Sequence, residues 1–199
     1  MKKMIKKFLV PSLSILVSCS AMAHHECDYS ANTKNKTLSW TAYKTPKKVG
    51  VRGSFSKFEI TSTKSKSINE LIKSASFTID SQSVETGDKA RDAKIMQFFF
   101  KTMAKGTKIT GKVLRIDNSK AQVEITMNGK TGNVEMAINY DEAKNNAVLS
   151  GTVDVINFAM EKNLADLTKA CMEKHEGKTW SDVSLELSAE ITKHCPDHK

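Results

Sequence analysis

The chain has 199 residues, a formal net charge of +9 and 39% hydrophobic residues. This length suits one domain with a substantial core. The basic residues are spread along the chain instead of forming a dense Lys/Arg block among aromatic residues, which argues against a nucleic-acid-binding protein.

The first 23 residues have the pattern of a secretory signal peptide. Lysines precede the apolar run Phe8–Val17, which is too short for a stable membrane anchor, and Ala21 and Ala23 give a small-x-small cleavage motif. Its removal leaves residues 24–199 as a single domain, and because it takes four lysines and no acid, the charge falls from +9 to +5. A second interpretation is a lipobox ending at Cys19, which would attach a lipid there. Either pattern predicts export to the periplasm, as a free protein or as a membrane-anchored lipoprotein.

Most of the remaining chain predicts β-strands. Apolar and polar residues alternate in segment after segment, and Asn128-Gly129 is a typical two-residue hairpin turn. The alternation shifts phase between Phe55 and Phe58, which predicts a bulge or bend near Ser56-Lys57. The expected strands are 38–43, 49–60, 77–80, 108–116, 121–127, 134–140, 148–156 and 183–191.

Three segments predict short helices or irregular crossovers. Ser67 and Glu70 form a capping box at the start of 67–72. Residues 91–103 are apolar with charged flanks. Residues 161–176 have apolar residues at helical spacing, with Gly177 in the position of a C-cap. Eight antiparallel strands with one apolar face either close into a β-barrel or form an open sheet beneath the helices. We expect an all-β fold of the first kind.

The order of several short motifs resembles the YceI-like family of exported lipid- or polyisoprenoid-binding proteins. The motifs lie between about Leu38 and Ile191, and they are Val51-Arg52-Gly53-Ser54-Phe55, Ile79-Asp80, Ser83-Val84-Glu85-Thr86-Gly87-Asp88, Arg91-Asp92 with Ile95 and Phe98-Phe99, and Leu149-Ser150-Gly151-Thr152-Val153-Asp154-Val155. The resemblance implies a lipocalin-like, eight-stranded antiparallel barrel whose elongated apolar cavity holds an isoprenoid chain, in some members ending in a quinone. The family often has a histidine two residues after its Arg-Asp pair, where this chain has Lys94.

The inward apolar positions of the strands are compatible with a filled core or with a ligand cavity. The strand pattern alone favours a filled core, and the family resemblance favours a cavity, with methionines as an adaptable wall. The expected lining residues are Trp40, Phe77, Ile79, Val123, Ile125, Met127, Met136, Ile138, Val153, Leu185 and Leu187.

The crossover 91–103 is a candidate lid over the mouth of the barrel. Ile95, Phe98 and Phe99 would close the cavity or plug the core, and consecutive phenylalanines cannot all face one side of a helix. Arg91 and Asp92 either anchor this lid, or a ligand head group, or form a surface ion pair.

Three cysteines remain after cleavage, and an oxidising compartment favours a disulfide. Closure of a barrel would bring the two chain ends together, so Cys27 with Cys195 is the preferred pair and Cys171 is a rival partner. Cys171 and His175 lie four residues apart on one helix face, but they lack a third orienting group, and we expect no enzyme activity. His24, His25, His194 and His198 lie in the polar chain ends, where histidines usually belong to a solvated tail, so no metal site is predicted.

The sequence therefore predicts a periplasmic protein that binds a polyisoprenoid or a similar long-chain lipid, without a catalytic cofactor. The alternative is an envelope interaction module with a filled barrel and no lipid ligand. The two differ in one observable property, which is whether the interior is hollow.

Overall fold

The structure, a computed structural model, describes residues 27–196. The predicted signal peptide and lipobox therefore lie outside the described residues, as do His24, His25 and His198. The described part is mostly β, with ten strands and a few short helices. The strands are β1 (Asp28–Lys44), β2 (Val49–Phe55), β3 (Phe58–Thr61), β4 (Ser76–Asp80), β5 (Val84–Glu85), β6 (Lys108–Asp117), β7 (Lys120–Met127), β8 (Lys130–Asp141), β9 (Asn146–Asp154) and β10 (Thr179–His194).

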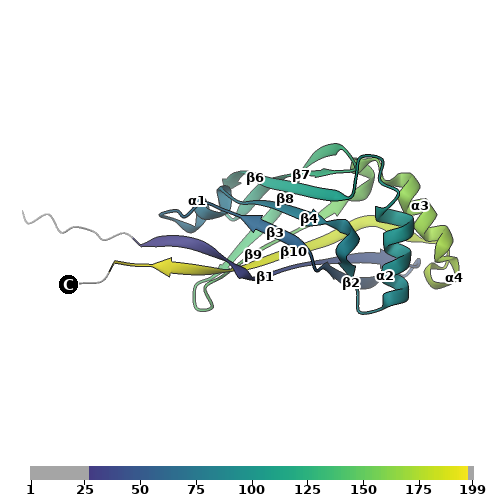
Figure 1. Ribbon diagram of the computed structural model, residues 1–199, viewed down its shortest axis with the longest axis horizontal. Coiled ribbons are helices and arrows are strands. Elements are labelled where there is room, and N and C mark those ends of the chain that lie inside the picture. The colour runs from purple at the N-terminus through teal and green to yellow at the C-terminus, as the bar shows by residue number, and fades with distance from the viewer. Residues whose placement is uncertain (1–26, 197–199) are drawn as a thin grey trace, which may run out of the picture.

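All strands belong to one curled antiparallel sheet, as Figure 1 shows, in the order β3-β4-β6-β7-β8-β9-β10-β1-β2-β5. The side-chain alternation of β7 is typical of the wall: Ala121, Val123, Ile125 and Met127 are buried, and the residues between them are partly exposed. The turn between β7 and β8 places Asn128 and Gly129 at positive φ, as the sequence predicts. The all-β prediction, with a curled antiparallel sheet and short helices, is confirmed.

The predicted strand 49–60 is divided into two strands. β2 ends at Phe55 and β3 begins at Phe58, and the chain changes partner between them, since β2 pairs with β1 whereas β3 pairs with β4. The bend at Ser56-Lys57 explains the phase shift in the sequence, because it keeps both phenylalanines on the inner side. This division and the two-residue strand β5 raise the strand number from eight to ten.

The divided strand leaves a seam in the wall between β1 and β3. On this side β1 is paired with β2 over Ser39–Lys44 and through a single bridge between Tyr29 and Ser65. β3 pairs only with β4. Between these points the two strands meet through side chains, and the Lys36 ammonium lies 4.9 Å from the centroid of the Phe58 ring. We call this gap between the ladders, residues 30–38 of β1 against β3, the seam.

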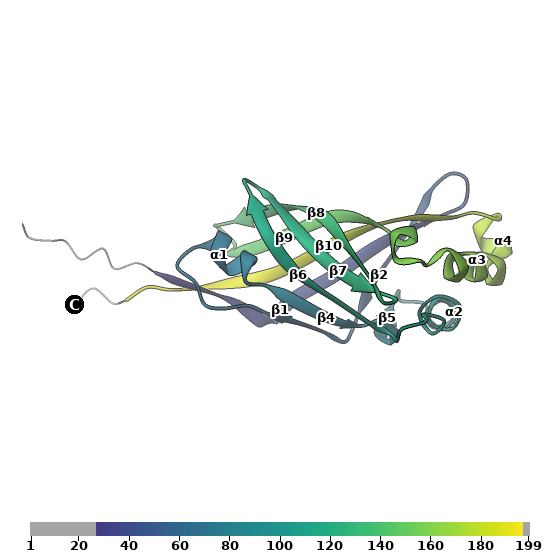
Figure 2. The same cartoon turned by 90° about the horizontal axis from the view of Figure 1, so that it is seen from above.

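The helices lie at the two ends of the elongated molecule. α1 (Ile68–Lys73) lies at the end that holds the chain termini, and α2 (Lys89–Ile95), α3 (Glu161–Ala170) and α4 (Met172–His175) lie at the other end (Figures 1 and 2). α2 continues as a π-helix, η2 (Met96–Phe100), and the 3-10 segments are η1 (Ser81–Ser83) and η3 (Val155–Phe158).

The single helix predicted for 161–176 is broken at Cys171. The backbone there has φ −120° and ψ 22°, which separates α3 from α4. The Thr168 hydroxyl donates to the carbonyl of Leu164 at 2.7 Å, a contact that commonly bends helices. Glu176 and Gly177 both have positive φ and end α4 in the expected place.

A disulfide joins Cys27 to Cys195, with 4.2 Å between the Cα atoms. It follows directly on the β1–β10 ladder, whose last pair is Asp28 with His194. This is the pairing that the sequence analysis preferred over the alternatives with Cys171. Cys171 is a free, partly buried thiol.

Candidate functional site

The interior of the curled sheet contains an apolar cavity of about 160 Å³. Nearly all of its lining is hydrocarbon, contributed by the inner faces of the strands and by α2, η2 and α3 at one end. The lining residues are Leu38, Trp40, Ala42, Phe55, Phe58, Phe77, Ile79, Ile95, Phe99, Phe100, Ile109, Ile125, Met127, Met136, Val153, Val155, Leu164, Leu167, Thr179, Trp180, Val183, Leu185 and Leu187.

Most of the residues expected at a ligand site lie on this wall. They are Trp40, Phe77, Ile79, Ile95, Phe99, Ile125, Met127, Met136, Val153, Leu185 and Leu187. Val123 lines a second cavity, Arg91 lines a third, and Phe98 and Ile138 line none of the three. The structure thus brings together side chains from strands that are far apart in sequence.

The three cavities share walls and follow one another along the barrel. The second, of about 60 Å³, lies toward α1 and shares Phe77, Met136 and Leu187 with the central cavity. The third, of about 340 Å³, lies among α2, α3, α4 and the ends of β1 and β10, and we call it the chamber. It shares Trp40 and Ile95, among others, with the central cavity. The interior therefore has the form of an elongated, mainly apolar space with a polar end.

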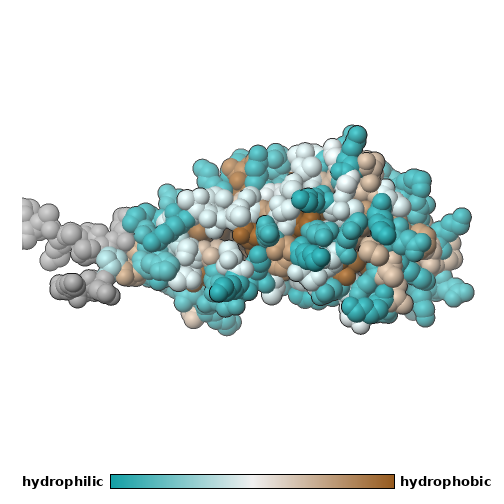
Figure 3. Space-filling model, in the orientation of Figure 1, coloured by the Kyte–Doolittle hydropathy of each residue, from teal (hydrophilic) through white to brown (hydrophobic). Residues whose placement is uncertain are grey.

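The outer surface over this interior is largely hydrophilic. On the face seen in Figure 3, hydrophilic residues dominate and hydrophobic residues show in small, separate areas. Large apolar side chains that are exposed, such as Val49, Leu114 and Ile156, are few and come from separate elements. The apolar surface available to a ligand is thus mainly internal.

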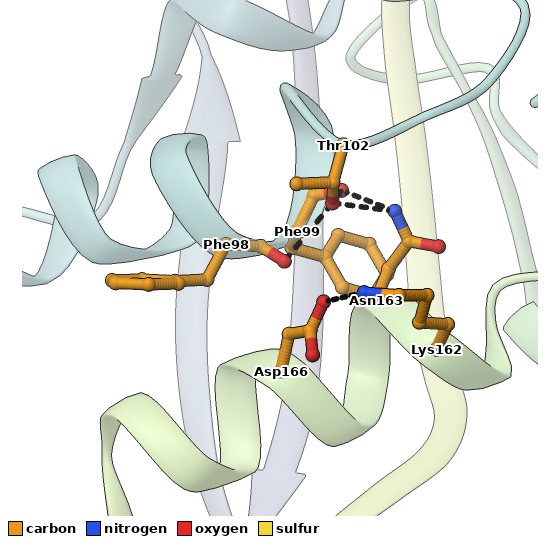
Figure 4. Close-up of polar contacts among 6 residues, drawn as sticks. All are labelled: Phe98, Phe99, Thr102, Lys162, Asn163 and Asp166. Carbon is orange, nitrogen blue, oxygen red and sulfur yellow. Dashed lines mark hydrogen bonds and ion pairs between the residues drawn. The ribbon is translucent and has the colours of Figure 1, made fainter.

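The three phenylalanines of η2 face different ways. Phe99 and Phe100 are buried, with their ring centroids 5.1 Å apart in an edge-to-face arrangement, and both line the central cavity. Phe98 points away from α3, as Figure 4 shows. The π-helix produces this arrangement, since the amide of Lys101 bonds to the carbonyl of Met96 at 2.8 Å, five residues earlier.

A buried asparagine connects the crossover to α3. Asn163 donates from Nδ2 to the Phe99 carbonyl at 2.9 Å and to the Thr102 hydroxyl at 2.7 Å (Figure 4). The carbonyls at the end of a helix have no partner within it, so these bonds satisfy one of them inside the protein. The crossover that the sequence suggested as a lid is therefore hydrogen-bonded to α3.

The side chains of Arg91 and Asp92 both form hydrogen bonds to Thr86 instead of pairing with each other. The buried carboxylate of Asp92 accepts from the amide and the hydroxyl of Thr86, at 2.8 and 2.5 Å. The guanidinium of Arg91 donates to the Thr86 hydroxyl and carbonyl, both at 2.8 Å. Together they fix the loop between β5 and α2. Arg91 also lines the chamber.

Cys171 and His175 do not form a nucleophile and base pair. Nδ1 of His175 lies 2.7 Å from the Thr179 hydroxyl, which lies 2.8 Å from the Thr168 hydroxyl. Burial, together with the charges of Lys44 and Lys94, lowers the pKa of His175 below its ordinary value. The imidazole is therefore neutral near pH 7, with Nδ1 hydrogen-bonded to Thr179.

Trp40 forms the boundary between the central cavity and the chamber. Its indole lies against Gly53, where an added Cβ would be 2.3 Å from Cζ2 of the ring, so only glycine leaves room for it. The indole N–H is buried and has no acceptor among the described residues. Such a group has a cost of about 1–3 kcal/mol in the folded state.

Several lining residues were not expected from the sequence. Leu38, Phe55, Phe58 and Phe100 belong to predicted elements, and their inward phase could have identified them. Leu164 and Leu167 lie on the apolar face of the predicted helix, but the sequence does not show that this face covers a cavity. Residues 27–196 contain no group of three His, Cys, Asp or Glu side chains placed to hold a metal ion.

Comparison with known proteins agrees with this architecture. The family model described as YceI-like domain matches residues 29–191. The chain belongs to the YceI-like family. This confirms the resemblance seen in the sequence motifs. No curated protein matches this sequence.

Two solved structures show the same fold at low sequence identity. A polyisoprenoid binding domain from Saccharophagus degradans, implicated in plant cell wall breakdown, aligns with a TM-score of 0.60 at 14% identity, covering 84% of this chain and 98% of that domain. BcnA from Burkholderia cenocepacia aligns with a TM-score of 0.54 at 16% identity, covering 79% of this chain and 96% of BcnA. In the described part of this YceI-like protein, no helix is long and apolar enough to cross a membrane.

Proposed function

We propose that this YceI-like protein binds a polyisoprenoid or a similar long-chain lipid in its interior and performs no chemistry on it. The observation that carries the proposal is the row of adjoining cavities, whose central part is lined almost entirely by hydrocarbon. The Saccharophagus domain with the same fold is described as polyisoprenoid-binding, which supports the same class of ligand here. A quinone-like end of the ligand remains part of this proposal.

The size of the interior sets how much of a lipid it accepts without rearrangement. Apolar cavities of about 150 Å³ in proteins bind molecules such as benzene, so the central cavity alone fits one or two isoprene units. A longer chain needs the neighbouring cavities and movement of flexible side chains. Met127 and Met136 stand on the wall, and unbranched thioether side chains adapt their shape easily.

Burial of hydrocarbon is sufficient to supply the affinity. Each buried CH₂ group contributes about 0.8 kcal/mol, and a chain of several isoprene units buries many of them. Part of this gain offsets the lost freedom of the ligand and of the wall. Binding should therefore become tighter with chain length until the interior is full.

We also propose that the N-terminal segment directs export and that the mature protein acts in the periplasm, either as free residues 24–199 or as a lipoprotein that begins at Cys19. The disulfide between Cys27 and Cys195 supports this location, since such bonds persist in oxidising compartments.

Native mass spectrometry of gently purified protein tests lipid binding directly. The expected result is a bound species with the mass of an isoprenoid or other long-chain lipid, recovered by organic extraction. Leu185→Trp should fill the central cavity and remove most of the bound lipid while the fold is retained. The matched variant Leu114→Trp changes an exposed leucine of β6 and should keep it. Failure of the wild type to retain or take up any lipid would contradict the proposal and favour the scaffold alternative.

A further inference from the structure

The chamber at the α2/α3/α4 end combines a strongly cationic lining with a wall that it shares with the apolar interior. Its charged side chains come from three elements and one cap residue: Lys44 from β1, Arg91 and Lys94 from α2, Lys174 from α4, and Asp88 at the N-cap of α2. Four cations thus face one carboxylate. The chamber is also the largest of the three cavities, at about 340 Å³, and has a substantial polar wall.

The carboxylate in the chamber offsets only part of this charge. Hydrogen bonds from backbone amides, together with the charges of Arg91 and Lys174, lower the pKa of Asp88. Asp88 caps α2, and its Oδ1 accepts from the amides of Ala90 and Arg91 at 3.0 and 3.1 Å. Within residues 27–196, no ion pair joins any of the four cations to an acidic side chain. A concentration of unpaired positive charge in a concave site favours an anion.

Two of the cations are held in position by the surrounding backbone. Lys94 donates from Nζ to the carbonyl of Ala170, the last residue of α3, at 3.2 Å. Arg91 is held by Thr86 through two hydrogen bonds. Part of the charge is therefore fixed before any ligand arrives, which lowers the entropic cost of binding.

His175 adds an imidazole to the same chamber. Its Nδ1 is hydrogen-bonded to the Thr179 hydroxyl, and its Nε2 has no hydrogen-bond partner among the described residues. The nearby charges of Lys44 and Lys94 disfavour the cationic form of the ring, and a bound anion would offset them.

We propose that the chamber binds the phosphate head group of an amphiphile whose hydrocarbon chain lies in the central cavity. This inference rests on the proposed lipid-binding function and names the head group of its ligand. Side chains shared by the two spaces, Trp40, Ile95 and Leu167, separate them, so one molecule would occupy both by displacing these side chains. A phosphate monoester carries between one and two negative charges near pH 7, which matches the excess of cations better than a neutral alcohol or quinone does.

A matched pair of ligands separates head-group recognition from chain binding. Geranylgeranyl monophosphate and geranylgeraniol have the same hydrocarbon chain, and their affinities can be compared by native mass spectrometry or by tryptophan fluorescence. We expect the phosphate to bind at least about tenfold more tightly at low salt, as charge-assisted hydrogen bonds allow. The advantage should shrink with added salt, because part of the site is exposed to solvent.

Substitutions assign the effect to the chamber rather than to the general positive charge of the protein. In Lys94→Gln/Lys174→Gln the phosphate should lose about tenfold in affinity while the alcohol is unaffected. Lys169→Gln removes an exposed lysine of α3 that lines none of the three cavities, and it should leave both affinities unchanged. In addition, the phosphate ligand should raise the pKa of His175, measured by NMR of its ring protons, and the alcohol should not.

The outcomes distinguish this inference from the proposed function. Equal affinities for phosphate and alcohol would overturn the phosphate site and leave lipid binding intact. If neither ligand binds, the proposed function itself fails. Inorganic phosphate provides the third comparison: we expect it to bind much more weakly than the lipid. Binding of the free ion as tightly as the lipid phosphate would overturn the head-group assignment and identify the chamber as an anion site.

Discussion

Asn163 on α3 donates a buried hydrogen bond to the main-chain carbonyl of Phe99 in the π-helix, with 2.9 Å between Nδ2 and the oxygen. The two residues lie 64 positions apart, and this bond joins η2, which lines the central cavity, to α3, which lines both the central cavity and the chamber. The walls of both candidate binding spaces therefore depend on one side-chain amide.

Replacement of this amide should loosen the closed end of the barrel. Asn163→Ala removes two buried hydrogen bonds, to the Phe99 carbonyl and to the Thr102 hydroxyl, and leaves that carbonyl with the Thr102 hydroxyl as its donor at 3.1 Å. We expect the free energy of unfolding to fall by about 1–2 kcal/mol. Urea denaturation measures this change. The control is Lys162→Ala, at the position before Asn163, which removes an exposed ion pair with Asp166. It should lower the free energy of unfolding by less than about 1 kcal/mol. Equal losses for the two variants would show that the amide has no special role.

Gly53 should be required for the position of Trp40. In Gly53→Ala the new methyl group overlaps the indole, since Cβ would lie 2.3 Å from Cζ2. Displacement of the ring should lower stability by about 1–3 kcal/mol and reduce lipid affinity, because Trp40 lines both the central cavity and the chamber. Gly50→Ala is the matched control on the same strand, where the nearest atom is Cγ2 of Thr41 at 3.1 Å. A Gly53→Ala protein with wild-type binding would show that the ring position is unimportant.

The disulfide should stabilise the end of the barrel opposite to the chamber. Cys27→Ser/Cys195→Ser opens a covalent loop that spans 168 residues, and we expect a loss of about 2–4 kcal/mol in the free energy of unfolding. Thermal denaturation of the oxidised protein and the double variant measures this. Cys171→Ser should have little effect, because this thiol is free. If Cys171→Ser instead proves as destabilising as the double variant, the assigned pairing is wrong.

His175 should make stability depend on pH just below neutrality. Its pKa in the folded protein lies below the ordinary value of 6.5, so as the pH falls below 6.5 the unfolded chain takes up a proton first. The free energy of unfolding should therefore decrease with falling pH until the lower, folded-state pKa is passed. Urea denaturation between pH 7.5 and 5.5 should show this slope in the wild type and a smaller one in His175→Gln. An unchanged slope in the variant would assign the effect to another group.

The strands could be predicted from the sequence wherever one face of the sheet is buried and the other is wet. The first strand shows where this fails: it begins at Asp28, ten residues before the alternation at Leu38 starts. Residues 32–37 are polar on both faces. Asn32, Lys36 and Thr37 pair with β10 around an irregularity at 33–35, a tertiary interaction that local pattern does not encode. The phase shift in the sequence predicts the break between β2 and β3. It does not predict that β2 pairs with β1 whereas β3 pairs with β4.

The candidate site was predictable in its apolar part and not in its polar part. Strand residues such as Ile125 and Leu185 face inward because their neighbours are polar, so the alternation identifies them. The chamber depends on lysines from β1, α2 and α4, and a single lysine in a sequence is usually a solvated surface residue. Only the fold shows that Lys44, Lys94 and Lys174 line the same space.

At the seam, β1 and β3 are not joined by main-chain hydrogen bonds. Along residues 30–38, separation of the two strands would break apolar packing and the contact between Lys36 and Phe58, but no ladder bond. The energetic cost of such an opening follows the apolar area that becomes wet, and this cost weakens on cooling. Transient separation of β1 from β3 at the seam should therefore have the temperature dependence of a hydrophobic contact. It should not have that of strand unfolding.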